Sequence, residues 1–157
     1  MADKLSKHFL FQEFIRSNTA EKRGIRNKPS LQHIINATAH AHVILEPLRA
    51  YLDKPIIITS WYRSPELNAA VGGSKTSTHM TGAATDIRIS GMTPGEIIEA
   101  IKNLKLPTDQ CLDEGFHRGD DWISWAHVAS PKDFSLKPRG EILLARGDRS
   151  NPTYTVA

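Results

Sequence analysis

Two segments of the chain carry apolar residues at the three- and four-residue spacing of a helix that covers a core. The first stripe runs from residue 31 to residue 52 and comprises Leu31, Ile34, Ile35, Thr38, His42, Leu45, Leu48 and Leu52. Ser30 is a favourable N-cap for this helix, and Pro47 is expected to kink it. The second segment begins with the capping-box spacing of Thr93 and Glu96, and its stripe comprises Ile97, Ile98, Ile101 and Leu104. We predict a core-packed helix in each segment.

The first of these helices contains three histidines. His42 lies on the apolar stripe and is predicted to be a core histidine. His33 and His40 lie off the stripe, so we expect both to be solvated.

Five other segments have the composition of strands, with β-branched residues or an alternation of polar and apolar positions. They are residues 56–60, 83–89, 108–114, 122–129 and 141–145. The third and fourth flank a polar stretch, residues 115–121, and are expected to pair antiparallel. The predicted fold is therefore α+β, a small, mostly antiparallel sheet with helices packed on one side.

The remaining segments are predicted to be short helices, loops and a tail. Residues 9–17 are expected to form a short helix, and residues 19–29 a loop. Ser64 and Pro65 can begin a short helix that ends near Val71. We expect one domain over residues 1–157, with a core of about residues 5–147 and a loosely held tail from residue 146 or 148 to the end.

Composition and charge exclude several classes of protein. The net charge is +3, and the 20 Lys and Arg residues form no basic stripe, so we expect no nucleic-acid partner. No apolar run is long enough to span a membrane, and the N-terminus resembles no secretory signal. We therefore expect a monomer made in the cytoplasm without membrane insertion. The single cysteine, Cys111, excludes an internal disulfide and is predicted to be buried.

The strongest chemical signal is the stretch from Ser77 to Asp86. It places His79 and Asp86 on either side of a turn at Gly82, with His79 at a loop end and Asp86 in the predicted strand 83–89. Imidazole and carboxylate groups are common ligands of zinc. His127, in the predicted strand 122–129, is the best candidate for a third ligand. Two histidines and one aspartate would leave a position for water, which is typical of a catalytic zinc site.

The motif Ser77-x-His79-x-x-Gly82-x-Ala84-x-Asp86, followed by Trp125-x-His127, resembles the D-Ala-D-Ala carboxypeptidase family of zinc metallopeptidases. Within that family the chain is most similar to a branch found in phages and prophages, described as peptidase C-terminal-domain-like. That branch also has Arg63-Ser-x-x-Leu-Asn68 before the first histidine and Asp109-Gln110 before the last. The matching positions run from about residue 5 to residue 130.

The resemblance implies one zinc ion held by His79, Asp86 and His127. It also implies that Arg63 holds a peptide carboxylate or stabilises an oxyanion, although a structural Arg63 that fixes the loop is an alternative. Ser77 is expected to orient a ligand, to bind substrate or to cap a turn. Gln110 is a candidate contact to the substrate backbone.

The general base is the point at which the chain departs from the better-known family pattern. Many members carry an acid or a histidine three to five residues before the last ligand, but this chain has Trp122, Ile123 and Ser124 there. The phage-type branch instead has the pattern Asp-Gln-x-x-x-Glu, to which this chain is similar. Glu114 falls on the glutamate of that pattern and is therefore the first choice for the general base. The alternatives, in order, are Asp121, Asp113 and His117.

The resemblance implies a zinc peptidase that hydrolyses a bond next to a D-configured residue in the peptidoglycan peptide, as a carboxypeptidase or an endopeptidase. Such an enzyme would act on the cell wall after release, as a phage endolysin does, or as part of a virion. The alternative is a non-catalytic, zinc-stabilised binding or structural module of the same fold. A nucleotide or DNA-end metalloenzyme is disfavoured because there is no phosphate-binding loop.

Overall fold

The structure is a computed structural model that describes residues 3–148 and 151–156, and side chains are described except in residues 146–148, 151 and 152. Its helices are α1 (Phe11–Ile15), α2 (Asn18–Arg23), α3 (Leu31–His40), the π-helical turn η1 (Ala41–Leu45), α4 (Glu46–Leu52), α5 (Pro65–Ala70), the 3₁₀ turn η2 (Thr78–Thr81) and α6 (Pro94–Asn103). Its strands are β1 (Ile57–Ser60), β2 (Ala84–Arg88), β3 (Gln110–Arg118), β4 (Asp121–Ala129), β5 (Glu141–Asp148) and β6 (Asn151–Val156). No helix within this described part is long and apolar enough to cross a membrane.

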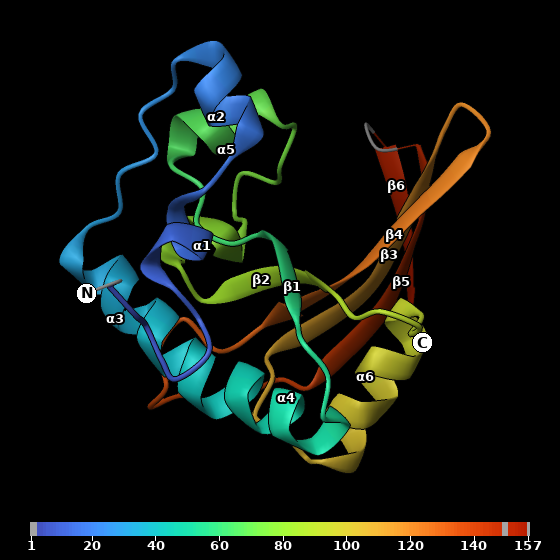
Figure 1. Cartoon of the computed structure of the whole chain (residues 1–157). Coiled ribbons are helices and arrows are strands. Elements are labelled where there is room, and N and C mark those ends of the chain that lie inside the picture. Colours follow the sequence, from blue (N-terminus) through green and yellow to red (C-terminus); the bar gives the residue numbers. More distant parts are fainter. Residues whose placement is uncertain (1–2, 149–150, 157) are drawn as a thin grey trace.

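The six strands form one sheet in the order β1-β2-β4-β3-β5-β6. Every neighbouring pair is antiparallel except β3 and β5, which run parallel. Helices α3, α4 and α6 lie below the sheet in Figure 1, whereas α2 and α5 form a separate lobe above β2. The α+β prediction, with a mostly antiparallel sheet, is therefore confirmed.

The two faces of the sheet have different environments because successive side chains alternate between them. On one face Ile87 of β2, Cys111 of β3 and Val128 of β4 are fully buried against the helices. Burial raises the pKa of the Cys111 thiol to about 11, so this cysteine is a core residue, as predicted. On the other face, Asp86 of β2 and Glu114 of β3 line an open cleft. The alternation thus separates the core from the candidate chemistry.

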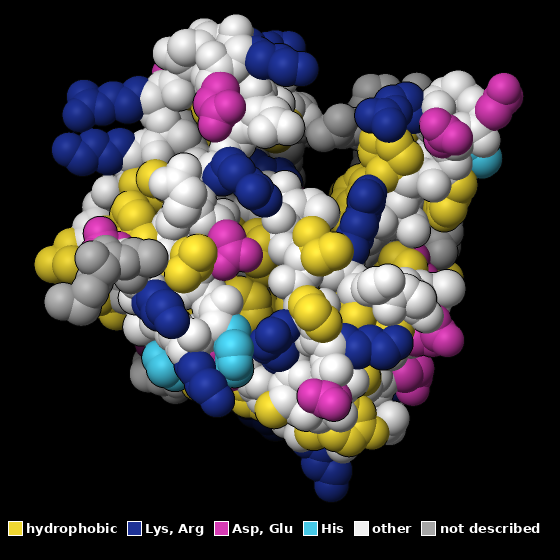
Figure 2. Space-filling model, viewed as in Figure 1, with side chains coloured by type: hydrophobic (Ala, Val, Ile, Leu, Met, Phe, Trp, Pro, Cys, Tyr) yellow, Lys and Arg dark blue, Asp and Glu magenta, His cyan; other side chains and the backbone are white. Residues whose placement is uncertain are grey.

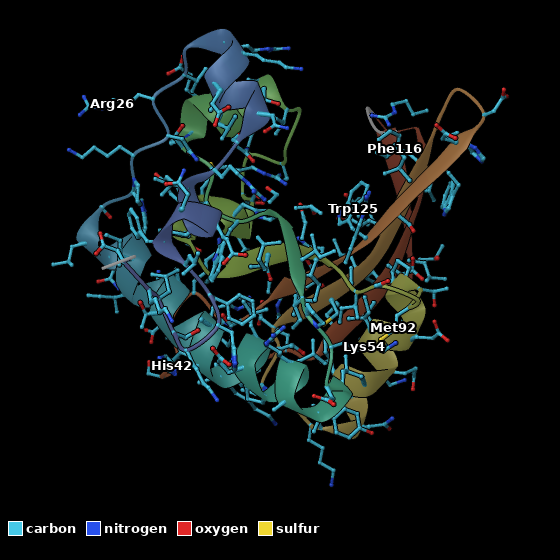
Figure 3. All side chains as sticks on the ribbon, viewed as in Figure 1. Arg26, His42, Lys54, Met92, Phe116 and Trp125 are labelled. Atoms are coloured by element: carbon cyan, nitrogen blue, oxygen red, sulfur yellow. The ribbon has the colours of Figure 1, made fainter. Side chains whose placement is uncertain are left out.

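The long first helix is present, but its buried face differs from the prediction. Leu31 and Ile35 are exposed, and so is His42, which points away from the protein in Figure 3. His40, which was predicted to be solvated, is fully buried. The π-helical turn is not the cause, because Leu31, Ile35 and His40 all precede it. The buried face includes the small residues Ala37 and Ala41 and the polar His40, which a stripe of large apolar residues does not contain.

Three predicted loops are shorter than expected or contain regular structure. Residues 18–23 form α2, which begins at the N-cap Ser17 and ends at Gly24 in the left-handed conformation. The predicted loop 115–121 is mostly paired strand, and only residues 119 and 120 turn between β3 and β4. The predicted tail is wrong for residues 146–148 and 151–156, because β5 continues through the first segment and β6 occupies the second.

His40 joins the core to the strand that carries Asp86. The Ser130 hydroxyl donates to the Ala83 carbonyl at 3.2 Å and accepts from His40 Nδ1 at 2.9 Å. The other ring nitrogen, Nε2, then accepts from the Thr85 hydroxyl at 3.0 Å. Burial, together with the nearby rings of His127 and His79, lowers the pKa of His40 to about 3. His40 is therefore neutral, and its hydrogen bonds stabilise the core side of β2.

We predict that His40 makes the metal-free protein sensitive to mild acid. Its pKa is lower in the folded than in the unfolded chain, so its stabilisation is complete above about pH 6.5 and is lost as the pH falls towards 3. Relative to His40→Gln, which cannot titrate, the wild type should lose about 2 kcal/mol of unfolding free energy between pH 7 and pH 5. Urea unfolding of both proteins in chelator measures this difference. A difference between the two proteins that stays constant with pH would contradict the assignment.

Candidate metal centre

Three buried side chains converge on one point of the cleft face of the sheet. Asp86 on β2 lies directly opposite His127 on β4, and His79 approaches from η2. His79 Nε2 is 3.1 Å from Asp86 Oδ1 and 3.2 Å from His127 Nδ1, and the latter two atoms are 3.0 Å apart. These residues form the one group of three or more His, Cys, Asp or Glu side chains in the described chain that could hold a metal ion.

The size of this triangle fits a zinc ion. A tetrahedral centre with bonds of about 2.0–2.1 Å to nitrogen and oxygen separates its ligands by roughly 3.3 Å. The three observed separations, 3.0–3.2 Å, are close to that value. The three residues are between 2% and 7% exposed, so little rearrangement is needed to close around a cation. Two nitrogens and one oxygen form a donor set that suits zinc and leaves a fourth position open.

The orientation of His79 is fixed from behind by the backbone. Its Nδ1 donates a hydrogen bond to the Trp61 carbonyl at 2.6 Å, which leaves the Nε2 lone pair directed at the cation position. The Trp61 indole in turn donates to the Gly82 carbonyl at 2.9 Å. Gly82 has a φ of +81°, and an added Cβ would lie 2.5 Å from the His33 carbonyl oxygen. Glycine is therefore required at this turn, as the sequence predicted.

Asp86 is held by a second group. Its Oδ2 accepts from Arg63 Nη2 at 2.7 Å, so Oδ1 is the oxygen that faces the histidines. Arg63 Nε donates to the Ser60 hydroxyl at 2.9 Å. The structure thus places Arg63 at the site as a residue that positions a ligand. Its predicted contact with substrate stays a prediction.

The protonation states match those of metal ligands. Burial raises the pKa of Asp86, but the nearby His79 ring, a hydrogen bond from His127 and the Arg63 guanidinium outweigh burial and hold it well below its usual range. Burial lowers the pKa of His79, and the Arg63 and His127 charges add to that effect against the pull of Asp86. The carboxylate is therefore ionised and the His79 ring is neutral.

Glu114 lies on the same face of the sheet. It pairs with Trp125, two residues from His127 along β4, and its Oε2 accepts from the Trp125 indole nitrogen at 2.7 Å. Burial raises the pKa of Glu114, and the Asp86 charge raises it further, against smaller opposing effects from His127, the Trp125 hydrogen bond and Arg63. A carboxyl group with a raised pKa beside a candidate metal position suits a residue that accepts and releases a proton.

The alternative bases lie elsewhere. Asp113 faces the opposite side of β3, where its Oδ2 is near Gly95 of α6. Asp121 is exposed at the β3–β4 turn, and the His117 ring packs edge-on against exposed Trp122. These three residues are not among the side chains that line the cleft. Of the four predicted candidates, only Glu114 lines the cleft together with the candidate metal ligands.

The cleft has a volume of about 750 Å³ and lies between two different walls. One wall is the polar loop of residues 72–78, which follows α5 and includes Ser77. The other wall is the β3–β4–β5–β6 part of the sheet, and in Figure 3 both Phe116 and Trp125 point from it towards the α5 lobe. In the space-filling view the lobe of α2 and α5 and the far end of the β3–β4 hairpin stand apart at the top of the molecule (Figure 2).

The other two predicted site residues, Ser77 and Gln110, line this cleft and make hydrogen bonds within the protein. The Ser77 hydroxyl accepts from the His79 backbone N–H at 3.4 Å as the N-cap of η2, which matches the predicted turn cap. Gln110 Nε2 donates to Glu141 on the neighbouring strand. Asn68 braces the loop, because its Nδ2 donates to the Ser74 carbonyl at 2.9 Å. No contact of Ser77 or Gln110 with substrate is implied by these bonds.

Sequence reasoning missed several residues of the site. The carbonyl of Trp61 is a backbone group, and no side-chain pattern marks it. Leu143 and Ala145, in the predicted strand 141–145, and Tyr154, in the predicted tail, line the cleft from β5 and β6. Glu141, Leu143 and Ala145 alternate onto one face of β5, and this pattern could have indicated that Leu143 and Ala145 share the face of Glu141.

Comparison with known proteins supports the same assignment. The sequence model of the family described as peptidase M15 matches residues 7–129, which is most of the 157-residue chain and includes all three candidate ligands and Glu114. None of the curated proteins matches the chain. The chain belongs to the peptidase M15 family, the D-Ala-D-Ala carboxypeptidase-like zinc peptidases.

Proposed function

We propose that this protein is a zinc peptidase that hydrolyses a peptide bond in bacterial peptidoglycan, next to a D-configured residue of the stem or cross-bridge. The observation that carries the proposal is the buried His79–Asp86–His127 triangle with Glu114 beside it in one cleft. Family membership supports the peptidase class, and the peptidoglycan substrate follows from the resemblance of the motifs. The protein would reach the wall after release from the cell or as part of a virion.

A zinc ion bound by these three residues would lower the pKa of a water molecule in the open position and polarise the scissile carbonyl. Glu114 would accept the proton of the attacking water and pass it to the departing amine. Its raised pKa suits this role, because the group gains a proton more readily than an ordinary carboxylate. The Trp125 indole holds the carboxylate in place.

The position of Glu114 also favours an enzyme over a zinc-stabilised binding module. A purely structural zinc site is usually closed by four protein ligands. Here three protein ligands lie at the bottom of an open cleft, and the neighbouring acid is half-buried and directed into it. The missing acid near His127 in the sequence is therefore replaced by one from the adjacent strand.

We predict that zinc binding depends on the ligand triangle and on Arg63. His79→Ala should abolish stoichiometric zinc, and Arg63→Met should weaken zinc binding about 10–100-fold because Asp86 loses its anchor. His42→Ala, which removes an exposed histidine, is the matched control. Competition with a chelating dye and elemental analysis after dialysis measure the effect. Full zinc content in His79→Ala would refute the site.

We predict that Glu114→Gln lowers the rate of hydrolysis about 10²–10⁴-fold while zinc content is unchanged. Asp113→Asn, which changes the neighbouring carboxylate on the opposite face of β3, should keep at least half of the activity. The measurement is mass spectrometry of soluble products after zinc-loaded protein is incubated with purified peptidoglycan. If the wild type releases no product from any wall type, the peptidase proposal fails and the binding module replaces it.

We predict a pH profile controlled by Glu114. The base acts when deprotonated, so kcat/KM should rise with pH through the raised pKa of this residue. Trp125→Phe removes a hydrogen bond that stabilises the carboxylate, so the acidic limb should move to higher pH. An acidic limb that stays in place, or moves to lower pH, would mean that another group controls it.

A further inference from the structure

Three residues form a row across the strands on Glu114's side of the cleft. Glu114 on β3 pairs with Ala145 on β5, and Ala145 pairs with Tyr154 on β6. Directly opposed residues of a sheet point to the same face, and neighbouring strands lie about 4.8 Å apart. Tyr154 is therefore two strands from Glu114, with only the methyl group of Ala145 between them.

The side chains of this row lie close together. Ala145 is 3% exposed although it faces the cleft, so neighbouring side chains cover it. Tyr154 is half-exposed at the mouth of the cleft. Burial raises the pKa of its phenol, and the charge of Glu114 raises it further, which is consistent with a ring that leans towards Glu114. Leu143 and Phe116 extend the wall as an apolar surface.

The chemistry of hydrolysis indicates which part of a substrate lies there. Glu114 must deliver its proton to the nitrogen of the departing amine, so the residue that carries this nitrogen lies beside Glu114. Glu114 is also the residue that adjoins the Ala145–Tyr154 surface. The part of the substrate that leaves therefore extends over β5 and β6.

The charges along this wall restrict what can leave. Among the described side chains that line the cleft, Arg63 is the one Lys or Arg, and its Nη2 is bonded to Asp86. Glu114 supplies negative charge next to Ala145, whereas Glu141, at the start of β5, is paired with Arg139 Nη1 at 3.5 Å. A free carboxylate beside Ala145 and Tyr154 would face Glu114 with no Lys or Arg next to it among the described side chains that line the cleft, whereas an amide continuing along the chain would not be repelled.

We propose that Leu143, Ala145 and Tyr154 form the subsite for the residue whose amine is released, and that this subsite selects a residue inside a chain over a free C-terminal one. The protein is then an endopeptidase. This inference rests on the proposed function and refines it. The subsite also lies beyond residue 129, outside the segment that the family model matches, so it is a feature of this chain's own C-terminal strands.

The first test is a pair of synthetic stem peptides with identical residues around the cleaved bond. In one the leaving residue ends in a free carboxylate, and in the other it ends in an amide. Zinc-loaded wild type should cleave the amide with at least about tenfold higher kcat/KM, because like charges in a cleft cost binding energy. Equal rates, or a preference for the free carboxylate, would overturn the selection of a chain-internal residue.

The second test locates the subsite with variants of β6. Tyr154→Ala should lower kcat/KM for the amide peptide about 10–100-fold, the scale of losing contacts in an apolar pocket, whereas Tyr154→Phe should stay within about twofold of wild type. Thr155→Ala is the matched control, since its side chain lies on the opposite face of the same strand. Zinc content should be equal in all four proteins.

The outcomes separate the two proposals. If the wild type cleaves neither the peptides nor peptidoglycan although it holds zinc, the proposed function fails and the subsite fails with it. If the wild type is active and Tyr154→Ala matches it, the subsite alone is wrong. If Tyr154→Phe is as impaired as Tyr154→Ala, the hydroxyl and not the apolar ring makes the contact, which also overturns the subsite as described.

Discussion

The pairing of Asp86 with His127 across β2 and β4 is the constraint on which the site depends. Side chains alternate along a strand, so a slip of one residue in this register would turn Asp86 into the core and a core residue into the cleft. The buried carboxylate is stable in its position because two imidazoles and a guanidinium surround it. Removing any of these groups would leave a buried charge without compensation.

The pairing is supported from both faces of β2. On the core side, neutral His40 connects Thr85 with Ser130, and Ser130 connects to Ala83. On the cleft side, two bonds of Trp61 join the end of β1 to the turn that carries His79, since its carbonyl accepts from His79 and its indole donates to Gly82. The fully buried Trp61 ring packs against Phe14 and Phe9 in the core. The metal position is therefore built into the core packing.

The sequence predicted that His79, Asp86 and His127 come together, because a metal site uses side-chain types that are rare in this combination. The turn at Gly82 and the strands that carry Asp86 and His127 were visible as local patterns. The sequence alone therefore predicted that His79, Asp86 and His127 lie close together. The buried face of the long helix could not be predicted in the same way, because it includes the small residues Ala37 and Ala41 and the polar His40, whereas the prediction followed large apolar residues.

The last strand, β6, was not predicted, although residues 141–145 of β5 were predicted to form a strand. β6 contains Pro152 and polar residues, a composition that is typical of a loop, yet an edge strand tolerates proline because half of its N–H groups need no partner. The strand is held by its pairing with β5, and β5 is held by its parallel pairing with β3. Such non-local pairing leaves no mark in a short window of sequence, and so the wall formed by β5 and β6 was not predicted.

The two carboxylates of the cleft show how one charge serves two purposes. Asp86 stays ionised because the groups around it favour the charged form, and it is thereby fitted to be a ligand. The same negative charge, added to the effect of burial, raises the pKa of Glu114. Two acids of similar intrinsic strength thus acquire different roles, since one is held as an anion and the other is poised to exchange a proton. This division depends on Arg63 compensating Asp86 from the side away from the histidines, so that the carboxylate can act as ligand and as electrostatic neighbour at once.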